Sequence, residues 1–355
     1  MTDIVISQTP LRISFLGGGT DFPEWYTKNG GAVLSTTINK YCHIVCVPSY
    51  PFYDYKYRIV YSNIEVSNNI EGIKHPVVRG VLKSYPDTKN IEVHYSGDLP
   101  AGAGLGASSA FSVGMINALE KYNGREISKE QLARSAIELE REVLKEVVGC
   151  QDQIATSYGG LNHIEFQQGG DFQVNPVFIS EERSQQLQDH LMLFFSGIKR
   201  RSSTVASSVV QNMTNENCNL KTMKQLVDEG VNILTNESCD LNAFGKLLHT
   251  NWQLKRELSQ SVSHSVVDEM YSKALKAGAI GGKLLGAGGG GFVLLFVEPE
   301  RQEKVAQALS SFKRVEFSFE TEGSRSYVQE ADTQTNNKAL WKKNYLKTKS
   351  KEEVH

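Results

Sequence analysis

Three glycines at alternate positions lead directly into two serines at the start of an apolar helical pattern. Gly102, Gly104 and Gly106 precede the pair Ser108 and Ser109. Glycine adopts positive φ and lets a ligand approach the backbone. The first turn of a helix adds free N–H groups and the positive end of the helix dipole. This combination predicts a phosphate-binding loop, although not the common P-loop, because the chain has no GxxxxGK[ST] pattern.

Two further glycine-rich segments sharpen that prediction. TPLRISFLGGGTDF stands at 9–22 and KLLGAGGGGFVLLF at 283–296. In their order along the chain, the three segments resemble the three motifs of the GHMP small-molecule kinases. That family includes galactokinases and the homoserine, mevalonate and phosphomevalonate kinases. The resemblance covers roughly residues 8–330. Within that family the variant GGGTDFPEWY, followed by GGAVLSTTINKY, is most similar to the D-glycero-D-manno-heptose 7-phosphate kinases.

The resemblance implies a fold and a set of cofactors. The fold would be α+β with two domains and the active site in the cleft between them. The cofactors would be ATP and Mg²⁺, since phosphoryl transfer needs a metal that bridges phosphates, charge stabilisation and a group that orients the acceptor hydroxyl. The residues expected to bind ATP are Gly102, Ala103, Gly104, Leu105, Gly106, Ala107, Ser108 and Ser109.

Carboxylates recur along the helix predicted at 138–147, and most of them must face solvent. Mg²⁺ prefers hard oxygen ligands and keeps several waters, so one carboxylate and one hydroxyl suffice. Related kinases place their metal carboxylate directly before an arginine, as Glu140 stands here. The resemblance therefore implies Glu140 with Ser108 as metal ligands, with Glu142 and Ser109 as the alternative.

Asp152 lies in the segment GCQDQIATSYGG. From the residues alone it could cap a helix over 153–158 as readily as do chemistry. The segment resembles the one that carries the catalytic aspartate of the family, which implies a catalytic Asp152. Arg12 aligns with the basic residue of the PGRVNLIGEHTDY-like motif of galactokinases. A cation there could lower the pKa of the acceptor hydroxyl and hold Asp152 in its ionised form.

The same motif implies how the acceptor is bound. Asp21 matches the sugar-binding aspartate, and Gly18-Gly19 stand where galactokinases carry Glu-His. Two missing side chains enlarge the pocket and remove a carboxylate that would repel an anion, which fits a phosphorylated sugar. A basic cluster at 199–201, followed by two serines, suits a second anion site. The predicted substrate contacts are Gly18, Gly19, Thr20, Asp21, Arg200, Arg201, Gly288 and Gly289.

The third glycine segment also fits the dinucleotide pattern GxGxxG through Gly286, Gly288 and Gly291. That motif must follow a strand and open a helix. Here FVLLFVE follows it and has the character of a strand. We therefore expect this loop to approach the nucleotide or the first glycine loop.

Composition favours an ordinary globular protein. The 355 residues suggest two domains, and 22% charged residues with a net charge of −2 give no attraction to nucleic acid or to an anionic membrane. No apolar run reaches the roughly 20 residues of a membrane span, and there is no signal-peptide pattern. Five cysteines without a CxxC pair indicate free thiols in a reduced compartment. We expect a cytoplasmic protein.

Residue patterns predict mixed strands and helices without a regular βαβ period, hence an α+β fold. The expected domains are 1–188 and 189–332, followed by a polar, lysine-rich tail at 333–355 that we expect to be disordered. The predicted strands are 4–16, 31–47, 57–66, 91–96, a hairpin over 161–179, 191–197, 291–297 and 314–321. The predicted helices are 107–122, 128–147 with Ser128 as cap, about 200–215, 219–236, 240–260, 264–277 and 300–312.

The predicted reaction is transfer of the ATP γ-phosphoryl group to the anomeric hydroxyl of a heptose 7-phosphate. The product, a heptose 1,7-bisphosphate, would feed nucleotide-activated heptose for surface glycans. The partners are then small molecules, the sugar phosphate and ATP, and the sequence leaves a homo-oligomer open. One alternative is a kinase for an unphosphorylated sugar such as fucose, galactose or a uronic acid. The other is a catalytically silent sugar and ATP sensor, against which the joint presence of Asp152, Arg12, Glu140 and Ser108 speaks.

Overall fold

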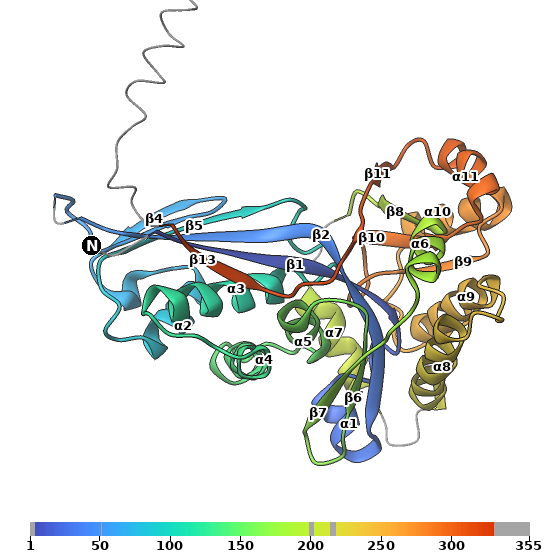
Figure 1. Ribbon diagram of the computed structural model, residues 1–355, viewed down its shortest axis with the longest axis horizontal. Coiled ribbons are helices and arrows are strands. Elements are labelled where there is room, and N and C mark those ends of the chain that lie inside the picture. Colours follow the sequence, from blue (N-terminus) through green and yellow to red (C-terminus); the bar gives the residue numbers. More distant parts are fainter. Residues whose placement is uncertain (1–3, 51, 199–201, 214–217, 330–355) are drawn as a thin grey trace, which may run out of the picture.

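The chain folds around two β-sheets that lie side by side (Figure 1). The structure is a computed structural model and describes residues 4–50, 52–198, 202–213 and 218–329. The larger sheet follows the order β13-β1-β2-β5-β3-β4. In addition, β12 and β6 pair with β2, and β7 pairs with β6. Its strands are β1 (Ile4–Leu16), β2 (Gly31–Pro48), β3 (Tyr57–Val60), β4 (Ile64–Ser67), β5 (Ile91–Gly97), β6 (Asn162–Phe166), β7 (Phe172–Pro176), β12 (Phe319–Glu320) and β13 (Arg325–Gln329).

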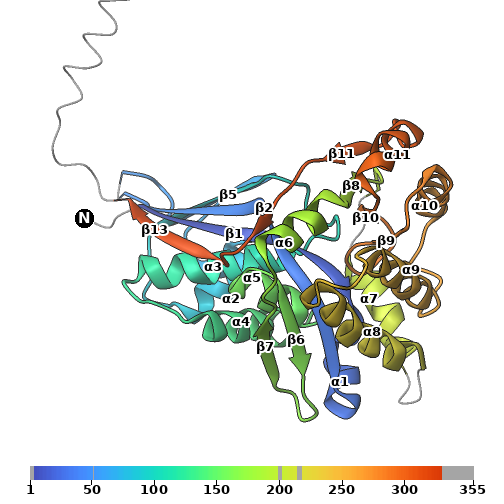
Figure 2. The ribbon, with the colours of Figure 1, turned by 45° about the vertical axis from the view of Figure 1, so that its right-hand side comes forward.

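The smaller sheet is antiparallel and follows the order β11-β8-β10-β9. Its strands are β8 (Leu191–Phe195), β9 (Gly281–Leu284), β10 (Phe292–Phe296) and β11 (Lys313–Val315). Every residue of β10 is buried, as expected for a central strand covered on both faces. Figure 2 shows α9, α10 and α11 around this sheet, whereas α8 packs on α9 and on β1 and β2 of the larger sheet. The helices of this half are α7 (Ser202–Gln211), α8 (Cys218–Thr235), α9 (Asn242–Arg256), α10 (Ser265–Ala277) and α11 (Gln302–Ala308).

Helices α2, α3, α4 and α5 of the first half lie along one face of the larger sheet (Figure 1). Helix α3 (Ala107–Tyr122) is buried at every position from Ser109 to Leu119, because it lies between the sheet and the neighbouring helices. Its Gly114 permits a close crossing, since a Cβ there would lie 2.8 Å from the Thr9 hydroxyl oxygen on β1. The other helices are α1 (Pro23–Asn29), α2 (Pro76–Ser84), α4 (Lys129–Glu138), α5 (Gln151–Tyr158) and α6 (Glu181–Asp189).

Most of the predicted elements are present, and the α+β class is confirmed. The capping box predicted at Ser128 is formed with Gln131. The segment 57–66 is not one strand but two, β3 and β4, joined by a turn. The sequence patterns missed the short elements α1, α2, α6, β9 and β13.

The helix predicted over 128–147 is α-helical only to Glu138 and ends at Val143. A π-helical turn occupies Leu139–Val143, and Lys145 has a positive φ of 56°. π-turns insert one residue into a helix and are frequent at functional sites. This turn carries Glu140 inward, where the residue is only 1% exposed.

The end of the described chain returns to the first sheet. Strand β12 pairs with β2, and β13 pairs with the edge of β1. Strands before 188/189 belong to the larger sheet, and strands after it belong to the smaller sheet except for β12 and β13. The domain boundary at 188/189 itself stays a prediction. The tail at 333–355 lies outside the described residues. None of the helices in the described ranges is long and apolar enough to cross a membrane.

Candidate active site

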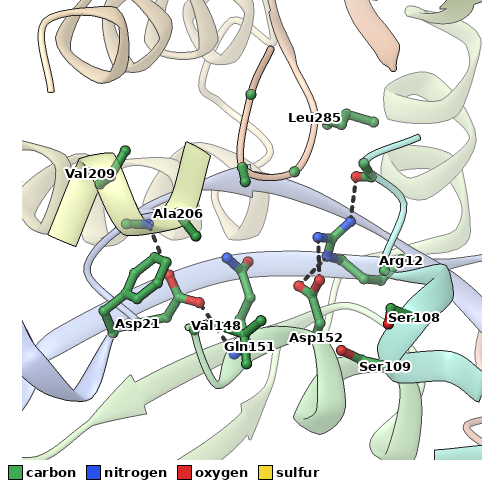
Figure 3. Close-up of a pocket in the computed structure, with 18 of the residues that line it drawn as sticks. Arg12, Asp21, Ser108, Ser109, Val148, Gln151, Asp152, Ala206, Val209 and Leu285 are labelled. Atoms are coloured by element: carbon green, nitrogen blue, oxygen red, sulfur yellow. Dashed lines mark hydrogen bonds and ion pairs between the residues drawn. The ribbon is translucent and has the colours of Figure 1, made fainter. Parts of the chain in front are cut away.

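One cleft gathers the three glycine segments and the predicted acidic residues (Figure 3). It lies where four parts of the chain meet: the glycine loop at 102–106 (the first glycine loop), the start of α5, helix α9 and the glycine loop at 286–291 (the third loop). The lining includes, from the first half, Arg12, Gly19, Asp21, Gly102, Gly104, Gly106, Ala107, Ser108, Ser109, Glu140, Gln151 and Asp152, and from the second half Ala206, Val209, Lys255, Leu258, Leu285, Gly286, Gly288 and Gly290.

The first glycine loop has the conformation that its sequence predicts. Gly102, Gly104 and Gly106 have φ of 71°, 86° and 73°, a region that side chains rarely adopt. Gly106 is the N-cap of α3, so the free N–H groups of the first helical turn face the cleft. Ser108 is exposed at this helix start. The loop and helix together form an anion site of the kind that binds phosphates.

The third loop packs directly on the first one, as expected. A Cβ on Gly104 would lie 2.3 Å from the Leu285 carbonyl oxygen, and one on Gly286 would lie 2.5 Å from the Cα of Gly104. The amide of Phe292 donates to the carbonyl of Ala103 at 3.0 Å. Because β10 and not a helix follows the loop, the dinucleotide motif is excluded here.

Arg12 and Asp152 form a two-bond ion pair at the centre of the cleft. Nε and Nη2 of Arg12 donate to the two carboxylate oxygens of Asp152, each at 2.7 Å, and Nη1 donates to the carbonyl of Gly104 at 2.8 Å. Such paired contacts fix both position and orientation. Asp152 is the second residue of α5, and Cys150 holds the N-cap position of that helix. The cap role considered for Asp152 is therefore wrong.

Glu140 reaches the same cleft from the π-turn. Its Oε2 accepts hydrogen bonds from the Ser109 hydroxyl at 3.0 Å and the Gln153 amide at 2.5 Å. Burial raises the pKa of Glu140 to about 7, and these hydrogen bonds only partly oppose that shift. Its Oε1 has no hydrogen-bond partner among the described residues. Ser109, not Ser108, is thus the serine that contacts Glu140, while Ser108 also faces the cleft.

Backbone amides hold Asp21 in place. Its Oδ1 accepts from the amide of Gly19 at 2.8 Å and its Oδ2 from the amide of Gln151 at 3.4 Å. Burial raises the pKa of Asp21, and the nearby Asp152 raises it further. The Oδ2 atom also explains Gly149, because a Cβ there would lie only 2.0 Å away.

The structure brings some predicted site residues to the cleft and places others behind it. Thr20 is fully buried. Its hydroxyl lies 2.8 Å from the carbonyls of both Gly17 and Ala32 and accepts from the Ala32 amide at 3.0 Å, so it holds the loop together. Ala103 and Leu105 are buried beneath the glycine loop.

Other predicted contacts do not line the cleft as the described residues form it. Gly18 and Gly289 are absent from its lining, whereas the neighbouring Gly19, Gly288 and Gly290 are present. Arg200 and Arg201 lie outside the described residues, so their role stays a prediction.

Lys255 and Gln151 are among the side chains of this cleft that sequence reasoning missed. Lys255 stands near the end of α9, where a lysine ordinarily faces solvent, yet it is only 7% exposed. Its Nζ donates to the carbonyl of Gly286 at 2.6 Å. Burial lowers the pKa of Lys255 to about 8. No local pattern marks this residue, since its burial depends on the third loop folding over it.

Comparisons with known proteins agree with this geometry. Residues 72–160 match the family model "GHMP kinases N terminal domain", and residues 236–314 match "GHMP kinases C terminal". The D-glycero-alpha-D-manno-heptose 7-phosphate kinase of Campylobacter jejuni is 29% identical over 336 residues, which cover 90% of this chain and 98% of that one. A bifunctional fucokinase/GDP-fucose pyrophosphorylase of Arabidopsis thaliana is 25% identical over 85% of this chain and 31% of its own length.

Solved structures with the same fold include two bacterial sugar kinases. The crystal structure of a D-glycero-D-manno-heptose 1-phosphate kinase from Bacteroides thetaiotaomicron superposes with a TM-score of 0.73 and 25% identity, covering 92% of this chain and 100% of that one. A putative sugar kinase from Campylobacter jejuni superposes with a TM-score of 0.73 and 27% identity, covering 92% of this chain and 99% of that one.

Proposed function

The chain belongs to the GHMP kinase family and is an ATP-dependent sugar kinase, and from that premise we propose that its acceptor is D-glycero-D-manno-heptose 7-phosphate. The phosphoryl group would pass to the anomeric hydroxyl, giving the 1,7-bisphosphate for nucleotide-activated heptose. The observation that carries the proposal is the similarity to a heptose 7-phosphate kinase along nearly the full length of both chains.

The cleft supplies the groups that this reaction needs. The anomeric oxygen attacks the γ-phosphorus, the bond to the β-phosphate oxygen breaks, and ADP leaves. Asp152 is the carboxylate available to orient the hydroxyl or accept its proton, since it faces the cleft and is 25% exposed. Arg12 holds that carboxylate by two hydrogen bonds. The glycine loop and the start of α3 would bind the ATP phosphates.

The donor set at Glu140 fits a magnesium ion. Mg²⁺ binds through one or two carboxylates together with substrate phosphates and waters. Glu140 offers an Oε1 that the described residues leave without a partner. The Ser109 hydroxyl donates to its other oxygen, and Ser108 lines the same cleft. No cluster of three or more acidic, histidine or cysteine ligands occurs in the described ranges, which agrees with a metal held mainly by nucleotide phosphates. When bound, the metal would neutralise charge on those phosphates.

A kinase for an unphosphorylated sugar is the second candidate. The similarity to a plant fucokinase over 85% of this chain favours it. A coupled assay for ADP release over a panel of sugars and sugar phosphates separates the two. The proposal expects the highest kcat/KM with heptose 7-phosphate and a much lower value with the same heptose lacking its phosphate. Equal or better turnover of a neutral sugar would reject it.

A further inference from the structure

The described part of the cleft contains two cationic side chains, and they are not equivalent. Arg12 is neutralised by Asp152 through two hydrogen bonds, and its remaining amino group donates to the Gly104 carbonyl. Lys255 donates to one backbone carbonyl, that of Gly286, and no carboxylate of the described residues lies within ion-pair distance of its Nζ. An ammonium has three donors, so Lys255 retains donor capacity toward the cleft.

Lys255 belongs to a group of buried polar side chains around Gly18. A Cβ on Gly18 would lie 3.4 Å from the Ser14 Oγ, 3.5 Å from the Gln151 Nε2 and 3.7 Å from the Lys255 Nζ. All three side chains are at least nine-tenths buried. Within the described ranges, the Ser14 hydroxyl and the Gln151 Oε1 have no hydrogen-bond partner. Figure 3 shows the Gln151 side chain between those of Asp21 and Asp152.

We propose that Lys255 and Gln151 form an oxyanion-binding site on the acceptor side of the cleft, and that its ligand is a phosphoryl oxygen. This inference rests on the proposed function, because it assigns residues that bind the acceptor or the transferred group. Asp21 and Asp152 act on the Lys255 ammonium from a distance but form no ion pair with it. A buried ammonium without a direct counter-ion is costly, and a phosphoryl oxygen supplies that contact through a charge-assisted hydrogen bond. Nε2 of Gln151, which lies 3.5 Å from a Cβ built on Gly18, adds a neutral donor on the same side as the Lys255 Nζ.

Two phosphoryl groups share this chemistry. One is the group in transfer, because Lys255 is bonded to Gly286, which itself packs on Gly104 of the first glycine loop. The other is the phosphate that the acceptor already carries, because Lys255 also faces Gly18 and lines the cleft together with Gly19 and Asp21. The Michaelis parameters distinguish the two sources.

The test compares steady-state kinetics of Lys255→Met and Lys255→Gln with wild type. Lys246→Met is the matched control, since Lys246 lies on the same helix but is exposed. The acceptors are heptose 7-phosphate and the same heptose without phosphate. If Lys255 binds the acceptor phosphate, KM for the sugar phosphate rises about tenfold or more, while KM for the neutral sugar does not change. If it binds the group in transfer, kcat falls by a similar factor with both acceptors at unchanged KM.

Other outcomes overturn the proposal. Kinetic constants within twofold of wild type with each acceptor, or a loss of ATP affinity alone in calorimetry, would exclude an acceptor-side oxyanion site. Thermal unfolding of both Lys255 variants separates binding from folding, since Lys255→Gln keeps a polar side chain where Lys255→Met does not. Should the screen identify a neutral sugar as the acceptor, the proposed function fails. The Lys255 proposal then survives only if kcat with that sugar falls about tenfold.

Discussion

At the scale of single residues, the Arg12–Asp152 ion pair both fixes the orientation of the Asp152 carboxylate and neutralises its charge. The guanidinium is 2% exposed and the carboxylate 25% exposed, so one partner is fixed in the protein while the other meets the cleft. Asp152 keeps this position because it lies in the first turn of α5, whose N-terminus opens into the cleft. The acceptor hydroxyl can therefore reach the carboxylate without displacing Arg12.

We expect Asp152→Asn to lower kcat by about 10²–10⁴-fold, the usual contribution of general acid–base catalysis. The amide keeps the shape of the side chain but removes the charge that orients or deprotonates the hydroxyl. ATP affinity, measured by calorimetry without acceptor, should change little. Wild-type turnover in this variant would show that Asp152 only orders the cleft through Arg12.

Glu140→Gln should raise the Mg²⁺ concentration that gives half-maximal rate, because it removes the anionic ligand beside the phosphate loop. Glu142→Gln is the control, since Glu142 is exposed and pairs with Lys145 on the surface. Rates measured over a magnesium titration at saturating ATP give the comparison. If Glu142→Gln shifts the titration and Glu140→Gln does not, the assignment of the ligand is wrong.

The charge of Lys255 predicts a dependence on pH. Burial lowers the pKa of Lys255 to about 8, and the positive charge of Arg12 lowers it further. The carboxylates of Asp21 and Asp152 oppose this shift. Lys283, another buried lysine, lies close by. The ammonium is thus present below pH 8 and is lost as pH rises through that value. Above pH 8, KM for the sugar phosphate should rise if Lys255 binds the acceptor phosphate. If it binds the transferred group, kcat should fall instead. The same profile in Lys255→Met should lack this step; a step that persists belongs to another group.

These residues also show what sequence can predict. Arg12, Asp21, Glu140 and Asp152 stand in motifs, so the segments that carry them can be recognised from the order of residues alone. The contact of Ser109 rather than Ser108 with Glu140 depends on a π-turn, which no residue pattern signals. Lys255 escapes such reasoning because its surroundings come from a loop about 30 residues further along the chain.

At the scale of elements, the two glycine loops form one structure. Each supplies glycines where the other's backbone approaches too closely for a Cβ, as Gly104 meets Leu285 and Gly291 meets the Ala103 carbonyl. The sequence predicted that the third loop approaches the nucleotide or the first glycine loop, because a strand after it excludes a nucleotide fold of its own. The structure shows the contact with the glycine loop. It could not give the register of the contact, which depends on how β10 pairs with β8 and β9.

Gly104→Ala should therefore weaken ATP binding and lower stability together. Gly104 has a φ of 86°, and a Cβ would lie 2.3 Å from the Leu285 carbonyl oxygen, so the strain of a positive φ is joined by a backbone clash. We expect a loss of about 2 kcal/mol or more in the free energy of unfolding. Gly124→Ala is the control, since Gly124 has a φ of 70° but no described atom lies within 4 Å of a Cβ there. Equal losses in urea unfolding would mean that the loop contact carries no stability.

At the scale of the whole molecule, the order of the chain does not follow the two sheets. After the last strand of the smaller sheet, β11, the chain crosses back and adds β12 and β13 to the larger one (Figure 2). The predicted boundary near 188/189 rests on the strong strand that opens the second half. The return escapes prediction because β13 is a short, partly exposed edge strand without the alternation that marks a buried one.

This returning segment supports helix α5, which carries Asp152, from behind. The amide of Ser324 donates to the Thr156 carbonyl of α5 at 2.9 Å, and its hydroxyl bonds to that of Thr9 on β1 at 2.7 Å. Gly323 packs so closely that a Cβ there would lie 2.1 Å from the Ser157 carbonyl oxygen. Helix α5 is thus held between Arg12 at its first turn and residues 323–324 near its last.

A chain that ends at Ser318 should therefore lose cooperative folding of the first half, not merely activity. It lacks β12 and β13, which exposes the edge of β1 and removes the hydrogen bonds behind α5. A chain that ends at Gln329 keeps every described contact of β13, so its thermal midpoint and kcat should match the full chain. Circular dichroism melting and the coupled assay on both truncations give the measurement. If the chain ending at Ser318 melts like the full-length protein, the pairing of β13 with β1 does not support the fold, and Asp152 keeps its position through Arg12 and the packing of α5 on α3 and α4.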